Sequence, residues 1–113
     1  MTAGLQSKYL STIGLAARAG RLACGTQNVC DALKDGRAKL VIEADDNSAN
    51  TKKRIHDRCD YYGVRLIPAY ADGDGLAAAT GRTGACAAVA VCDESLARAV
   101  LASFERAASE NNK

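Results

Sequence analysis

Residues 85–92 form an apolar run that no polar residue interrupts. A strand with one face in water shows a polar residue at every second position, and this run shows none. A bilayer span needs about 20 apolar residues, so the run is also far too short to cross a membrane. The run therefore predicts a central strand covered on both faces, which places helices on both sides of a sheet.

Helical and extended apolar spacings alternate along the rest of the chain. They predict helices over residues 5–20, 26–35, 50–62, 76–80 and from 94 onward, with strands over residues 21–24, 39–44 and 64–70. Ser48 or Asn50 is expected to cap the third helix, Gly63 to end it, and Asp93 to cap the last helix. Ile55, Cys59 and Tyr62 are expected to face inward from the third helix, and Pro68 predicts an edge strand.

This order of elements predicts an α/β fold, a three-layer α-β-α sandwich with a central sheet of about four strands. The chain has 113 residues and is 48% hydrophobic, which suffices for a single domain over residues 1–113. Residues 1–10 lack the apolar stretch of a signal peptide, so we expect a cytoplasmic protein with no membrane contact.

Catalytic, cofactor and metal sites are not expected. Neither a Walker-type loop nor a Gly-x-Gly-x-x-Gly fingerprint occurs, and the five cysteines include no Cys-x-x-Cys pair. Reduced thiols are expected, with Cys30 and Cys92 as small apolar fillers. His56 shows no acid or base partner in the sequence. Asp45 and Asp46 suggest a metal site or a general base, but such a pair between strand and helix is more often a helix cap.

The start of the second helix is the strongest candidate for a binding site. Gly25, Thr26, Gln27 and Asn28 put polar groups on its first turn, before an apolar spacing typical of a helix. The first N–H groups of a helix lack internal partners, and the helix dipole is positive there. Such an end suits phosphates or the acceptor edges of bases. On spacing alone, a plain helix cap with polar flanks is the better interpretation.

Charge is distributed unevenly along the chain. Residues 1–65 hold 11 Lys and Arg against 7 Asp and Glu, whereas residues 66–113 hold 4 against 6. The balances of +4 and −2 are compatible with one face presented to a polyanion, but on charge alone an ordinary solvated surface is the better interpretation. Lys52, Lys53, Arg54 and Arg58 are expected to form the solvated exterior of the third helix, because Asp57 and Asp60 interrupt them.

Taken together, several segments resemble one known family. They are residues 25–28, residues 35–41 leading into a strand, residues 76–82 before an Ala-Val-rich strand, and residues 50–53 with Cys59, Tyr61 and Tyr62. Over about residues 9–101 the chain resembles the ribosomal protein L7Ae/L30e superfamily, and within it the small bacterial YlxQ-like members. The resemblance implies a non-catalytic RNA-binding protein of the ribosome and translation apparatus. Its expected partners are ribosomal RNA or another kink-turn RNA, and ribosomal proteins.

Members of that family typically recognise the kink-turn, a bent duplex built around tandem sheared G·A pairs. The start of their second helix enters the major groove that the bend widens. The residues carried over by the resemblance, together with nearby basic side chains, make up the candidate RNA-binding set: Arg21, Gly25, Thr26, Gln27, Asn28, Lys34, Arg82, Thr83 and Gly84.

Within that set, Gln27 stands where the family often has Asn, and Asn28 where it often has Glu or Gln. Arg82, Thr83 and Gly84 match the loop that packs against a flipped-out nucleotide.

Asp31 departs most from the family pattern, which usually has Lys at this place. A carboxylate there would repel phosphate, and Lys34, one turn later, would substitute for the missing cation in part. The departure leaves an alternative open, in which the chain is a protein-interaction adaptor with a degenerate RNA site. An enzymatic interpretation, by analogy with RNA-binding parts of ribose methyltransferases, is disfavoured because no cofactor motif occurs.

Overall fold

In the computed structural model, which describes residues 2–111 and the side chains of residues 7–109, four strands form one mixed sheet. The strands are β1 (Leu22–Cys24), β2 (Leu40–Glu43), β3 (Leu66–Pro68) and β4 (Ala88–Val91). Their order across the sheet is β1-β4-β2-β3. Strand β4 runs antiparallel to both β1 and β2, whereas β2 and β3 are parallel. Strand β3, which ends at Pro68, lies at an edge of the sheet, as expected.

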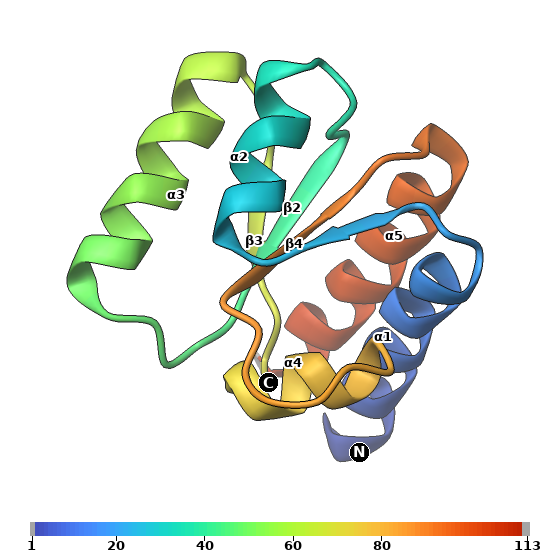
Figure 1. Ribbon diagram of the computed structural model, residues 1–113. Coiled ribbons are helices and arrows are strands. Elements are labelled where there is room, and N and C mark those ends of the chain that lie inside the picture. Colours follow the sequence, from blue (N-terminus) through green and yellow to red (C-terminus); the bar gives the residue numbers. More distant parts are fainter. Residues whose placement is uncertain (1, 112–113) are drawn as a thin grey trace.

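Helices cover both faces of this sheet. They are α1 (Thr2–Arg18), α2 (Thr26–Lys34), α3 (Ala49–Tyr62), α4 (Gly73–Ala79) and α5 (Glu94–Asn111). Helices α2 and α3 lie on one face, and α1, α4 and α5 lie on the other (Figure 1). The expected α/β fold with three layers and a four-stranded sheet is confirmed.

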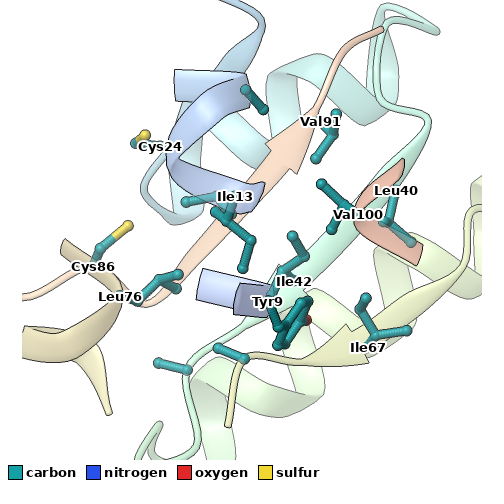
Figure 2. Close-up of a cluster of buried hydrophobic side chains, with 14 of the residues drawn as sticks. Tyr9, Ile13, Cys24, Leu40, Ile42, Ile67, Leu76, Cys86, Val91 and Val100 are labelled. Atoms are coloured by element: carbon teal, nitrogen blue, oxygen red, sulfur yellow. The ribbon is translucent and has the colours of Figure 1, made fainter. Parts of the chain in front are cut away.

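The central strands contribute alternate residues to two separate cores. Val89 and Val91 of β4 pack with α1, α4 and α5, in the cluster that Figure 2 shows. Ala88 and Ala90 of the same strand pack with α2 and α3. Both faces of β4 are buried, which explains why its sequence shows no polar alternation.

Local signals placed most helix ends correctly. The Ser48 hydroxyl accepts a hydrogen bond from the Thr51 N–H at 3.2 Å and caps α3. The Asp93 carboxylate accepts one from the Leu96 N–H at 2.9 Å before α5. Gly63 ends α3 in a left-handed conformation with φ 67°.

Three expectations were wrong in detail. Residues 85–87 precede the strand, because the Cys86 N–H bonds to the Gly73 carbonyl at 2.9 Å and ties this segment to α4. Helix α4 begins at Gly73, since Asp72 caps it through the Gly75 N–H at 2.7 Å. The Tyr62 ring is 37% exposed and lies outside the core, beside Tyr61.

No helix among residues 2–111 combines the length and the apolar character that crossing a bilayer requires.

Candidate nucleic-acid interface

A single glycine, Gly25, forms the turn from β1 into α2. Gly25 is the N-cap of α2, with φ 95° and ψ 152°, a region that only glycine adopts readily. Its N–H donates to the Ala88 carbonyl at 2.9 Å, which fixes the turn to β4. No side chain caps the helix, unlike α3 and α4. The first-turn N–H groups of α2 are therefore left without a side-chain acceptor, beside the exposed side chains of Gln27 and Asn28.

The Gln27 amide joins α2 to α3. Its Nε2 donates to Asp31 Oδ1 at 2.9 Å, and its Oε1 accepts from Arg54 Nη2 at 3.1 Å. Arg54 thus brings a cation to the start of α2, where the sequence shows only an acid. Arg54 lies on the exposed exterior of α3, as expected, and because α3 packs alongside α2 its side chain also reaches Gln27.

The neighbouring Lys53 behaves differently from Arg54. Its ammonium pairs with Asp57, one turn along α3, at 2.7 Å, and both side chains are exposed. The expectation of a solvated face therefore holds for Lys53, and the two adjacent cations of α3 have different environments.

Asn28 stabilises the same turn from within α2. Its Nδ2 donates to the Cys24 carbonyl at 2.8 Å, which is the last carbonyl of β1. This bond orients the amide so that it remains at the exposed end of the helix.

The loop after α4 lies beside this turn. Gly25, Arg82 and Thr83 line one open hollow of about 420 Å³, together with Cys24 and Cys86. The loop turns at two glycines in left-handed conformations, Gly81 and Gly84. Arg82, Thr83 and Gly84 are exposed. We call the combined area the α2–loop surface, which consists of Gly25, Thr26, Gln27, Asn28, Arg54, Arg82, Thr83 and Gly84.

Two candidate residues lie away from the α2–loop surface. Arg21 precedes β1 and lines a different hollow with Arg37 and Lys39, so the whole length of the strand separates it from Gly25. Lys34 is the last residue of α2, about 12 Å along the helix axis from Thr26 at about 1.5 Å per residue. The structure therefore does not bring these two cations to the exposed start of α2.

His56 has a partner that the sequence did not reveal. Its Nε2 lies 2.8 Å from Glu43 Oε1, and the Glu43 side chain is largely buried at the end of β2. The sequence implied no acidic partner for His56, because the contact joins residues on two different elements. Among the side chains that the structure describes, residues 7–109, no three from His, Cys, Asp or Glu are grouped so that they could hold a metal ion.

Of the acidic pair after β2, Asp46 acts as a helix cap, in agreement with that interpretation. Asp46 Oδ1 accepts a hydrogen bond from the Gly73 N–H at 2.9 Å. Asp46 therefore serves the first turn of α4, a helix distant in sequence, whereas Ser48 caps the helix that follows directly. Burial is the main cause that raises the pKa of the neighbouring Asp45.

The five thiols are all free, and they differ in environment. Burial raises the pKa of Cys59 to about 11. At Cys24, a hydrogen bond from the Cys86 thiol and the charge of Arg82 lower the pKa, against the effect of burial. Cys30 is buried, as expected of an apolar filler, whereas Cys92 is only half-buried.

Comparison with known proteins identifies the family. The model of the family described as "Ribosomal protein L7Ae/L30e/S12e/Gadd45 family" matches residues 7–101. A protein of Enterococcus faecium named RNA-binding protein YlxQ is 35% identical over 74 residues, 66% of this chain and 72% of that protein. The protein of the same name from Bacillus subtilis (strain 168) is 39% identical over 57 residues, 50% of this chain and 57% of that protein.

Solved structures agree on the fold. A protein of unknown function from Bacillus halodurans C superposes with a TM-score of 0.80 at 32% identity, covering 87% of this chain and 97% of that one. The Giardia lamblia 15.5kD RNA binding protein superposes with a TM-score of 0.72 at 17% identity, covering 94% and 89%, and this likeness concerns the fold alone. With the family model matching nearly the whole length and two relatives above 30% identity, the chain belongs to the ribosomal protein L7Ae/L30e/S12e/Gadd45 family.

Proposed function

We propose that this protein binds structured RNA through the α2–loop surface and catalyses no reaction on it. The proposed target is a kink-turn or a similarly bent duplex, in ribosomal RNA or another RNA of the translation apparatus, in the cytoplasm. Family membership and the names of the two YlxQ relatives support RNA as the ligand.

The observation that carries the proposal is the exposed, uncapped start of α2. Helix N-termini attract anions through their free N–H groups and the positive end of the helix dipole. Here the turn contains Gly25, so no Cβ separates the backbone from a ligand. Amide side chains follow directly at Gln27 and Asn28, and such groups donate to and accept from base edges.

A bent RNA suits this surface better than a regular duplex. The major groove of A-form RNA is deep and narrow, and side chains do not reach its bases. A sharp kink opens that groove and admits a helix end. Arg54 and Arg82 lie beside the start of α2, and two cations there would favour binding of RNA phosphates.

The environment of Asp31 favours RNA binding over the adaptor function. Its carboxylate accepts a hydrogen bond from Gln27, and Arg54 binds the opposite end of the same amide. The cation that the family usually supplies from α2 is thus supplied here from α3. Asp31 therefore gives no sufficient reason to regard the site as degenerate.

A binding series on paired RNAs tests the proposal. One RNA contains a kink-turn with its tandem G·A pairs, and in the other Watson–Crick pairs replace them. We expect at least about tenfold weaker binding of the second RNA, because the groove stays closed. Equal affinity would exclude recognition of the bend, and no binding to either RNA would favour the adaptor.

Neighbouring cations on α3 provide a matched pair of variants. Arg54→Gln removes the cation at the α2–loop surface, whereas Lys53→Gln removes one that pairs with Asp57. We expect Arg54→Gln to weaken RNA binding and to reduce the log–log salt slope by about 0.7 to 0.9. Lys53→Gln is expected to leave both close to wild type. Equal effects of the two variants would show that only overall charge matters.

A further inference from the structure

Two buried thiols line one hollow at the α2–loop surface. Cys24 is the last residue of β1, and Cys86 lies in the segment that leads into β4. Both belong to the core cluster on the α1 side of the sheet, where Figure 2 shows their side chains at one edge. Both also line the open hollow beside Arg82, so reagents in water can approach them although they are only 8% and 5% exposed.

Their surroundings favour an ionised sulfur on Cys24. The Cys86 thiol donates a hydrogen bond to the Ala88 carbonyl at 3.3 Å, and it lines the hollow together with Cys24. The Cys86 thiol and the charge of Arg82, which lines the same hollow, hold the pKa of Cys24 below its usual range, against the effect of burial. The hydrogen bond with Cys24 and burial raise the pKa of Cys86.

We propose that Cys24 and Cys86 form a redox-active pair, in which a hydroperoxide oxidises Cys24 and Cys86 then closes a reversible disulfide. The arrangement has the parts that such a pair needs: an attacking thiolate beside a cation, a second thiol adjacent to it, and an opening to solvent.

The chemistry balances with one equivalent of hydroperoxide. The Cys24 thiolate attacks the outer oxygen, so an S–O bond forms and the O–O bond breaks, and the alkoxide or hydroxide leaving group takes up a proton. The Cys86 sulfur then gives up its proton and attacks the sulfenic sulfur. The S–S bond forms, the S–O bond breaks, and water leaves. Two thiols are oxidised while the peroxide is reduced to an alcohol or water.

Peptide mapping of the full-length protein tests the pair directly. The native protein is treated with hydrogen peroxide, its remaining thiols are alkylated, and its tryptic peptides are analysed. Cys24 shares a peptide with Cys30, and Cys86 shares one with Cys92, so fragmentation must locate the linked sulfurs. We expect a Cys24–Cys86 link that dithiothreitol removes, with Cys59 alkylated as a free thiol. A different pairing, or five free thiols after treatment, would overturn the proposal.

Alkylation kinetics test the activation of Cys24 without any oxidant. In native protein, iodoacetamide should modify Cys24 at least about tenfold faster than Cys59, whose pKa burial raises to about 11. Arg82→Gln should slow the modification of Cys24 at least about threefold, because it removes the cation beside the sulfur. Arg98→Gln, an exposed change on α5, is the matched control and should leave the rate unchanged.

Equal rates at Cys24 and Cys59, or equal rates in the two arginine variants, would contradict the assignment. Neither experiment uses RNA, so its outcome is independent of the proposed RNA-binding function.

Discussion

Gly25 has the backbone conformation on which the α2–loop surface depends. With φ 95° and ψ 152° it turns the chain from β1 into α2, and a Cβ built there would meet no atom within 4 Å. The constraint on this residue is therefore the dihedral angle and not space. Any L-residue at this position would strain the turn or move the start of the helix.

Gly25→Ala is expected to lower both stability and RNA affinity. The conformation costs about 1–3 kcal/mol for a residue with a Cβ, and relaxation would displace the first turn of α2. The control is Gly63→Ala at the end of α3, where φ is 67° and the expected cost is about 1–2 kcal/mol. Denaturant unfolding and RNA titration of both variants check this. Retained RNA affinity in Gly25→Ala would show that the turn is not part of the binding site.

The buried hydroxyl of Tyr9 is a second single group on which the stability of the fold is expected to depend. Its ring is fully buried, packs against Tyr70 and Phe104, and its hydroxyl donates to the Pro68 carbonyl at 2.7 Å. Helix α1 is thereby joined to the end of edge strand β3. Burial is also the main cause that raises the pKa of Tyr9.

Tyr9→Phe should lower the free energy of unfolding by about 1 kcal/mol at neutral pH, because a carbonyl loses its donor. Tyr61→Phe, with a ring that is 81% exposed, should change it little. The folded state disfavours ionised Tyr9, so the wild-type protein loses stability above about pH 10. The difference in the free energy of unfolding between wild type and Tyr9→Phe therefore becomes smaller there. Denaturant titrations at pH 7 and pH 10.5 measure both effects. A difference in the free energy of unfolding that grows at high pH would contradict this account.

Among the elements, α2 differs from α3 and α4 in how its N-terminus is satisfied. The other two begin with a side-chain oxygen that accepts a backbone N–H, from Ser48 and Asp72. Helix α2 begins with glycine and leaves those donors open. An added acid near that end would neutralise the attraction for anions, which makes Asp31 the element's critical charge.

Asp31→Asn is expected to tighten RNA binding by about two- to fivefold, since it removes one negative charge beside the surface that we propose to bind RNA. The asparagine oxygen keeps an acceptor for the Gln27 amide. Asp35→Asn removes the same charge at the opposite end of α2, where Asp35 pairs with Arg37, and should have a smaller effect. Competition binding at two salt concentrations measures both. Weaker binding of Asp31→Asn would show that Asp31 positions Gln27 through its charge.

Over the whole molecule, two cores share one sheet. Alternate residues of β2 and β4 enter opposite cores, so neither core is complete without the same two strands. Ile13 fills one core from α1, and Ile55 fills the other from α3. This arrangement predicts that the two faces unfold together.

Ile13→Val and Ile55→Val should each lower stability by about 0.5–1.5 kcal/mol while keeping a single transition. Far-ultraviolet circular dichroism reports on all helices, whereas near-ultraviolet tyrosine signals are sensitive to Tyr9 and Tyr70 on the α1 face. Coincident transitions for both variants are expected from these probes. Separate midpoints in Ile55→Val would mean that the α2–α3 face unfolds on its own.

Local sequence patterns were sufficient to predict the features that depend on short-range physics. Apolar spacing gave the order of helices and strands, and a strand without polar alternation required helices on both faces. Gly63 and the side chains of Ser48 and Asp93 marked helix ends through bonds to residues only a few positions away. The exposed start of α2 followed from Gly25 and the polar residues after it.

Which distant residues come together depends on the three-dimensional packing of the elements. It brought Arg54 to Gln27, His56 to Glu43 and Cys86 to Cys24, and it left Arg21 and Lys34 away from the start of α2. Each of these outcomes depends on strand order, on the packing of one helix against another and on the path of a loop. Such contacts follow from how the helices and the sheet bury their apolar faces against one another, so they cannot be inferred from local periodicity in the chain.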